Sequence, residues 1–182
     1  MKKEDSTHKA TKGLVNVVLS MATMLLFMAS CDNTPVINVP DKDTDNQLKE
    51  RLINANKYIA TSETAQIDTY VARRGWEMQT LTCGARWCEY AVGKGASINY
   101  EDSVTITYSV EALNGTTFYT HKTERLAVGR HQTTTGIDAA LLKLHRGSKA
   151  RIIVPSEAGF GVVGDGDRIP TRAVLVYDLT VE

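Results

Sequence analysis

Residues 102–119, DSVTITYSVEALNGTTFY, contain the pattern that decides the fold of this chain. From Val104 to Val110 every second side chain is apolar, and threonine or serine fills most positions between, which is typical of a strand with one buried face. Asn114-Gly115 then offers a tight turn, and Thr116–Tyr119 is the next predicted strand. The stretch therefore predicts an antiparallel hairpin.

Toward the C-terminus, residues 151–154 and 173–181 have the composition of two further strands. Between the hairpin and these strands, residues 136–147 (GIDAALLKLHRG) predict one helix that ends at Gly147. Its apolar face consists of Ile137, Ala140, Leu141 and Leu144. A mostly antiparallel sheet with one short helix is an α+β fold.

Two helices are predicted before the sheet. The first has Leu48, Leu52, Ala55 and Ile59 on one face. Ser62 can cap the second, and Gly75 is expected to end it; its face holds Ile67, Tyr70, Val71 and Arg74. We interpret the pair as an amphipathic hairpin that covers its own domain, and a partner-binding helix is the alternative.

The first thirty residues have the pattern of an export signal. Four lysines precede LVNVVLSMATMLLFM, residues 14–28, which at about fifteen residues is shorter than the roughly 20 that span a bilayer. Met-Ala-Ser-Cys31 resembles the lipobox of bacterial lipoproteins, which implies cleavage before Cys31 and lipid attachment to it. A plain signal peptide with an incidental cysteine is the alternative. The lipobox implies a location in the bacterial cell envelope, anchored to a membrane on its periplasmic or surface face.

The sequence therefore divides into four predicted parts: a signal peptide (1–30), a flexible acidic tether (31–46), a helical extension (47–75) and a folded domain (76–182). Lys+Arg and Asp+Glu both number 21 in the 182 residues, so the chain has no basic field that would concentrate nucleic acid. A nucleic-acid partner is accordingly not expected.

Few residues of the domain suit metal or cofactor chemistry. Cys83 and Cys88 are interpreted as a disulfide across a hairpin or as free thiols, and a redox-active pair is disfavoured because their spacing is not C-x-x-C. No two of the histidines have the spacing of metal ligands. Residues 159–164 match G-x-G-x-x-G, but DGDRIP follows and cannot open a helix, so no dinucleotide site and no cofactor are expected.

Six short motifs follow one another from residue 102 onward: Asp102–Tyr108, Asn114–Phe118, Leu126–Gly129, Leu141–Lys149, Ile152–Gly161 and Ile169–Leu179. Their order resembles that of the FKBP-type peptidyl-prolyl isomerase domain. The resemblance implies an antiparallel half-barrel sheet wrapped on one short helix. It implies an isomerase (rotamase) for proline-containing segments of exported polypeptides. The lipobox and helical extension also resemble isomerase lipoproteins of the gliding-motility-associated type.

The resemblance also implies the site residues. Catalytic aromatic positions fall on Tyr108, Phe118, Phe160 and Tyr177, and substrate-binding positions fall on Tyr119, Thr134, Ile137 and Ile169.

Three positions depart from the family pattern. Phe160 lacks the hydroxyl of the usual tyrosine, Tyr119 replaces an aspartate, and Glu124 stands where an aromatic wall residue is common. These departures keep a second hypothesis open, in which the fold serves as a non-catalytic chaperone or protein-interaction module of the envelope.

Overall fold

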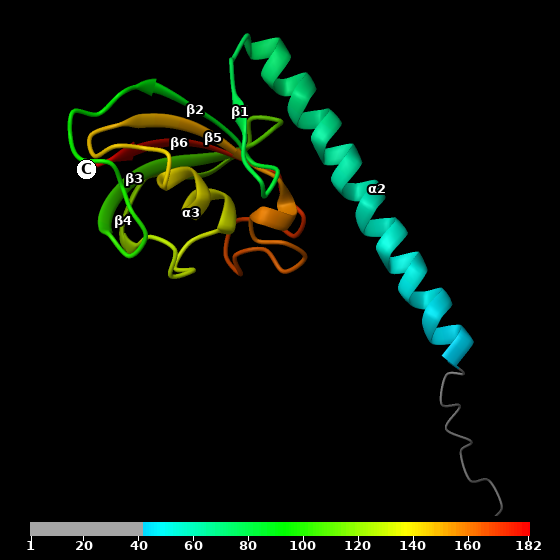
Figure 1. Ribbon diagram of the computed structural model, residues 1–182. Helices are drawn as coiled ribbons and strands as arrows, with labels where there is room; N and C mark the ends of the chain where they lie inside the picture. The colour runs from blue at the N-terminus through cyan, green and yellow to red at the C-terminus, as the bar shows by residue number, and fades with distance from the viewer. Residues whose placement is uncertain (1–41) are drawn as a thin grey trace, which may run out of the picture. The chain divides into compact units, whose positions relative to one another are not determined.

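The computed structural model describes residues 42–182, whose centre is a six-stranded antiparallel sheet that curves around one short helix (Figure 1). The strand order is β1-β2-β5-β6-β3-β4. The strands are β1 (Gln79–Thr80), β2 (Arg86–Ala91), β3 (Ser103–Ala112), β4 (Thr117–Ala127), β5 (Lys149–Val154) and β6 (Leu175–Val181). The predicted α+β architecture, an antiparallel sheet with one short helix and a helical N-terminal extension, is confirmed.

The predicted hairpin is formed by β3 and β4, but β4 continues to Ala127, well beyond the predicted Tyr119. The pairing shifts twice, once between Tyr108 and Val110 and once between Val110 and Glu111. In the second shift Phe118 is the extra residue on β4, since Val110 pairs with Tyr119 and Glu111 with Thr117. Such bulges break the two-residue alternation and re-aim the side chains around them.

Helix α3 (Thr135–Leu141) packs against β5 but is shorter than predicted. Gly147 does not end it, because the helix stops at Leu141 and a turn follows. Gly136 allows the close approach of helix and strand, since a Cβ there would lie 2.6 Å from Cγ1 of Val154. The apolar face of α3 is fully buried, as its spacing predicted.

The prediction of two N-terminal helices is wrong: α2 is a single helix over Lys42–Arg74. Ser62 lies inside it rather than at a cap. Thr61 and Thr64 are accommodated inside the helix, where their hydroxyls donate to the carbonyls of Lys57 and Ala60, each at 2.8 Å. Residues 42–46 of the predicted tether are helical as well.

The predicted stop at Gly75 is confirmed. Gly75 has φ +64°, and its N–H donates to the carbonyl of Ala72 while that of Trp76 donates to Val71. These two bonds form a Schellman motif, in which the left-handed glycine ends the helix.

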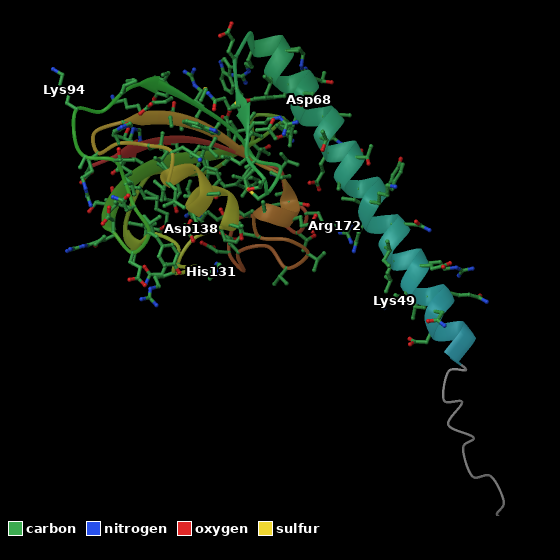
Figure 2. The ribbon with its side chains drawn as sticks, in the orientation of Figure 1. Lys49, Asp68, Lys94, His131, Asp138 and Arg172 are labelled. Carbon is green, nitrogen blue, oxygen red and sulfur yellow. The ribbon has the colours of Figure 1, made fainter. Side chains whose placement is uncertain are left out.

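Only the second half of α2 covers the domain. Ile67 and Tyr70 are buried against Ile153 and Val176. Asp68, which Figure 2 labels on α2, forms an ion pair with Arg86 of β2 at 2.9 Å. The first half of the predicted apolar stripe is instead exposed, with Leu48 and Leu52 at 56% and 57%.

A stack of aromatic rings and guanidinium groups joins the end of α2 to the sheet. The Arg74 guanidinium lies 4.7 Å from the ring centre of Tyr70 and 5.4 Å from that of Trp76. Arg151 of β5 lies 4.7 Å from both Trp76 and Tyr90. Trp76 therefore contacts two cations, which adds cation–π attraction to the apolar contacts of α2.

Cys83 and Cys88 are free thiols, so the disulfide interpretation is wrong. The register explains this: Gln79 pairs with Trp87 and Thr80 with Arg86, which leaves Cys83 in the turn and places Cys88 beyond it on β2. The predicted signal peptide and Cys31 lie outside the described residues. Within residues 42–182, no helix combines the length and the apolar character needed to cross a bilayer.

Candidate functional site

A cavity of about 260 Å³ opens where β3, β4 and β6 meet the loop after β5. Five of the eight predicted site residues line this cavity: Tyr108, Tyr119, Phe160, Ile169 and Tyr177. They come from four separate segments of the chain, so the fold brings together residues that the motifs identified one at a time.

Tyr108 and Tyr177 form the aromatic centre of the cavity. Their ring centres are 5.6 Å apart and the planes are inclined at 55°. Strand pairing sets this contact, because Tyr177 of β6 pairs with Val110 and so lies diagonally opposite Tyr108 on β3.

Burial raises the pKa of Tyr177, and the neighbouring Tyr108 adds to the shift. Burial, together with the nearby Glu124 carboxylate, also raises the pKa of Tyr108. Both phenols therefore stay neutral at physiological pH.

Tyr119 fixes one wall of the cavity through Asp165. Its hydroxyl donates to a carboxylate oxygen of Asp165 at 2.6 Å, and the bond raises the pKa of Tyr119 to about 12. The other oxygen of Asp165 accepts from three consecutive backbone N–H groups, including that of Ile169 at 2.7 Å. Asp165 thus connects the Tyr119 ring to the loop that carries Ile169.

A charged pair stands at the rim. Lys122 donates to Glu124 at 2.7 Å, and this hydrogen bond raises the pKa of Lys122 to about 12. The Lys122 ammonium also lies 4.8 Å from the ring centre of Tyr119. Glu124 therefore lines the cavity but is neutralised by a cation rather than left bare, which lowers the cost of a carboxylate in an aromatic wall.

Three predicted residues do not line the cavity itself. Ile137 and Thr134 are buried, and Oγ1 of Thr134 has no hydrogen-bond partner among the described residues. Phe118 packs half-buried against the core and borders a different hollow, because it is the extra residue of the β4 bulge.

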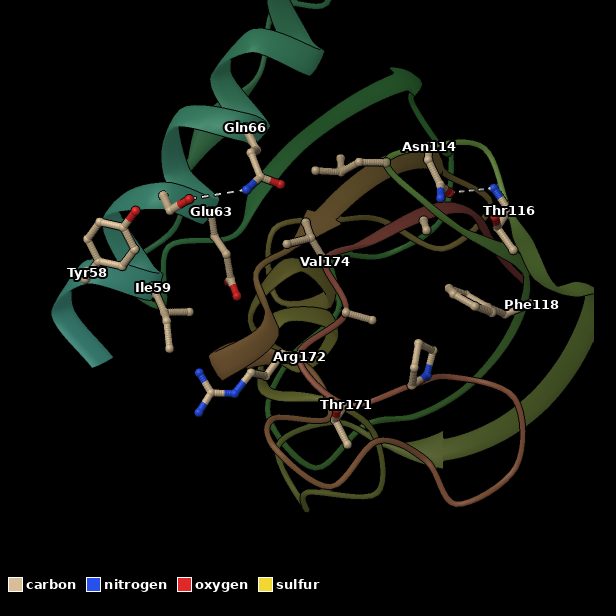
Figure 3. Close-up of a pocket in the computed structure, with 15 residues that line it drawn as sticks. Tyr58, Ile59, Glu63, Gln66, Asn114, Thr116, Phe118, Thr171, Arg172 and Val174 are labelled. Atoms are coloured by element: carbon tan, nitrogen blue, oxygen red, sulfur yellow. Dashed lines mark hydrogen bonds between the residues drawn. The ribbon is translucent and has the colours of Figure 1, made fainter. Parts of the chain in front are cut away.

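That second hollow is a groove of about 610 Å³ between α2 and the domain, which we call the α2 groove (Figure 3). Tyr58, Ile59 and Glu63 of α2 border it on one side. Phe118 and the segment 170–174 border it on the other.

The cavity residues that sequence reasoning missed include Lys122, Gln132 and Asp165. Lys122 could have been found from Glu124, since residues two apart on a strand share a face. Asp165 is the first residue of the DGD turn. Its carboxylate accepts hydrogen bonds from the N–H groups that follow it, as aspartate commonly does in turns. No sequence feature identified Gln132 as a residue of the cavity. Among residues 42–182, no three His, Cys, Asp or Glu side chains lie close enough to hold a metal ion.

The family model for FKBP-type peptidyl-prolyl cis-trans isomerase matches residues 95–182. This range contains the cavity, so the chain carries an FKBP-type peptidyl-prolyl isomerase domain.

Two individual proteins that resemble this chain are also named as peptidyl-prolyl isomerases. A probable FKBP-type peptidyl-prolyl cis-trans isomerase of Haemophilus influenzae is 25% identical over 142 residues, which is 74% of this chain and 59% of that protein. The human peptidyl-prolyl cis-trans isomerase FKBP9 is 30% identical over 96 residues, covering 50% of this chain and 16% of that protein. The chain therefore spans less than two thirds of either relative.

Solved structures show the same fold. A peptidyl-prolyl cis-trans isomerase from Pseudomonas syringae superposes with a TM-score of 0.58 at 21% identity, covering 69% of this chain and 92% of that one. The N-terminal domain of FKBP42 from Arabidopsis thaliana gives 0.53 at 18% identity, covering 58% and 90%.

Proposed function

We propose that the domain catalyses cis-trans isomerisation of peptide bonds that precede proline. The observation that carries this proposal is the Tyr108–Tyr177 aromatic pair in a cavity closed by Ile169, inside a domain of the FKBP type. Such a site suits a proline ring, which is apolar and compact.

The chemistry requires no nucleophile. Twisting an X-Pro bond costs ~18–20 kcal/mol because it breaks amide resonance. The twisted amide is less charge-separated than the planar one, so an apolar aromatic site favours it over the ground state. Each ~1.4 kcal/mol of such preference gives a tenfold rate.

The test is the isomerisation rate of a proline tetrapeptide with the full chain purified in detergent. We expect acceleration over the uncatalysed rate, and a large loss in Tyr177→Ala, because the aromatic centre is removed. Circular dichroism checks that the variant is folded. A folded wild-type protein with no acceleration would overturn the proposal.

A second candidate is a non-catalytic binding module that uses the same cavity. The Lys122–Glu124 pair at the rim and the missing hydroxyl of Phe160 favour it, since both make the cavity unlike an aromatic isomerase pocket. This module would bind an unfolded polypeptide equally well after every proline is replaced by alanine. A loss of binding on that replacement would exclude it.

We further propose that the protein is a lipoprotein of the bacterial envelope that folds exported polypeptides. The lipobox at Met28–Cys31 supports the anchor, and the lysine-rich, apolar leader supports export. Proline-containing segments of exported chains are then the substrates that the domain would meet.

A further inference from the structure

The α2 groove lies beside the cavity and shares the chain segments that form it. Ile169 lines the cavity while Pro170, the next residue, lines the groove. On β4, Tyr119 lines the cavity while Phe118 lines the groove. The two hollows are therefore one residue apart along both segments, so the groove is the neighbouring site for the rest of a polypeptide bound in the cavity.

The pairing of two central strands ends at the groove. Pairing of β3 with β6 stops at Ala112 and Leu175. Within the described residues, no backbone hydrogen bond joins the next pair, Leu113 and Val174, and both line the groove. Both strands lie inside the sheet, so the groove borders the end of a strand pair rather than a free sheet edge.

The charge at the groove indicates the side chain that it would accept. Arg172 is exposed at the groove and forms no ion pair within the described part of the chain. Glu63, labelled in Figure 3, is the one carboxylate among the lining residues. It is buried and accepts from the N–H and hydroxyl of Ser156. Arg172 therefore remains free for a carboxylate of another molecule.

We infer that the α2 groove binds the substrate segment next to the proline, with an Asp or Glu side chain of that segment paired to Arg172. Tyr58 and Ile59 supply apolar contact from the helix. This inference rests on the proposed function for the position of the proline, and it adds a sequence preference that the cavity alone does not give.

The test compares a proline tetrapeptide with longer peptides that have the same core. One longer peptide carries two glutamates before the core, one carries them after it, and matched versions carry lysines. For the wild-type chain we expect a lower KM for one of the glutamate peptides than for its lysine counterpart, by roughly two- to fivefold for one exposed ion pair. Equal KM values for acidic and basic extensions would overturn the inference.

Two variants locate the effect. Arg172→Glu should reverse the preference, so that the lysine peptide has the lower KM. Tyr58→Ala should reduce the advantage of either longer peptide over the tetrapeptide. Lys143→Ala and Leu52→Ala are the matched controls, since both residues are exposed and lie outside the groove lining. If these controls changed the preference as much as Arg172→Glu, the groove would not be the site.

Fluorescence anisotropy separates this inference from the proposed function. If tetrapeptide turnover were absent, the isomerase proposal would fail. Charge-dependent binding of the labelled longer peptides, reversed by Arg172→Glu, would still support the groove. If turnover were present but anisotropy showed no charge preference, only the groove inference would fail.

Discussion

Phe160 presents a bare ring to the cavity where a phenol could donate to a substrate carbonyl. We predict that Phe160→Tyr raises kcat/KM for a proline tetrapeptide, because one neutral hydrogen bond contributes about 0.5–1.5 kcal/mol, or roughly two- to tenfold in rate. Phe118→Tyr serves as the control, since Phe118 borders the α2 groove instead. An unchanged rate in Phe160→Tyr would show that this position does not face the reacting bond.

The Tyr119–Asp165 bond makes stability depend on pH in the acid range. Burial alone would raise the pKa of Asp165, but hydrogen bonds from Tyr119 and from the backbone hold it below its usual 3.8. A lowered pKa stabilises the fold above pH ~4, and that stabilisation is lost as the pH falls through the folded-state value.

We therefore predict that Tyr119→Phe destabilises the protein at neutral pH and that the difference from wild type shrinks below pH ~4. Urea unfolding of both proteins across this range measures it. Tyr100→Phe is the control, because the Tyr100 hydroxyl has no recorded hydrogen bond among the described residues. A pH-independent difference would mean that Asp165 is not the acceptor that matters.

At the scale of elements, Glu63 joins helix α2 to the short helix η2 (Ser156–Ala158), at whose start it accepts two hydrogen bonds. We predict that Glu63→Ala lowers the free energy of unfolding by roughly 1–3 kcal/mol, because a buried N–H and a buried hydroxyl lose their acceptor. Glu63→Gln should cost less, since it keeps one acceptor oxygen. Glu50→Ala, on the exposed part of the same helix, is the control for charge and helix propensity.

Periodicity predicted the elements whose burial alternates regularly, such as β3 and the buried face of α3. Periodicity gave wrong predictions where the local backbone geometry departs from the regular repeat. The bulge at Phe118 moved one predicted cavity residue to the α2 groove, and α2 continues across Ser62, where the sequence offered a cap. Neither effect is visible in apolar spacing, because that spacing does not determine strand register or whether a possible capping residue is used as a cap.

The candidate site was predictable to the extent that motifs fix positions in the chain. Tyr108, Phe160, Ile169 and Tyr177 were placed by resemblance, and the cavity contains all four. The contact of Tyr119 with Asp165 was not predictable, because the two residues are 46 positions apart and meet only in the folded chain.

At the scale of the whole molecule, the lipobox predicts that Cys31 is the residue that carries the lipid anchor. In a bacterial host that processes lipoproteins, we expect the wild-type chain to incorporate labelled fatty acid and to partition into detergent. Cys31→Ala should abolish both, because it removes the thiol that would be acylated. Cys83→Ala is the control within the domain and should partition as the wild type does. Equal labelling of Cys31→Ala would contradict the lipoprotein proposal.

The contacts around Trp76 allow its fluorescence to report whether α2 is docked on the sheet. The chain has two tryptophans, so replacing Trp87 with phenylalanine leaves a single emitter beside the guanidinium groups of Arg74 and Arg151. Undocking of α2 would release that indole into water and shift its fluorescence to the red. Emission spectra could then follow the undocking of α2 separately from the unfolding of the sheet, without an attached dye.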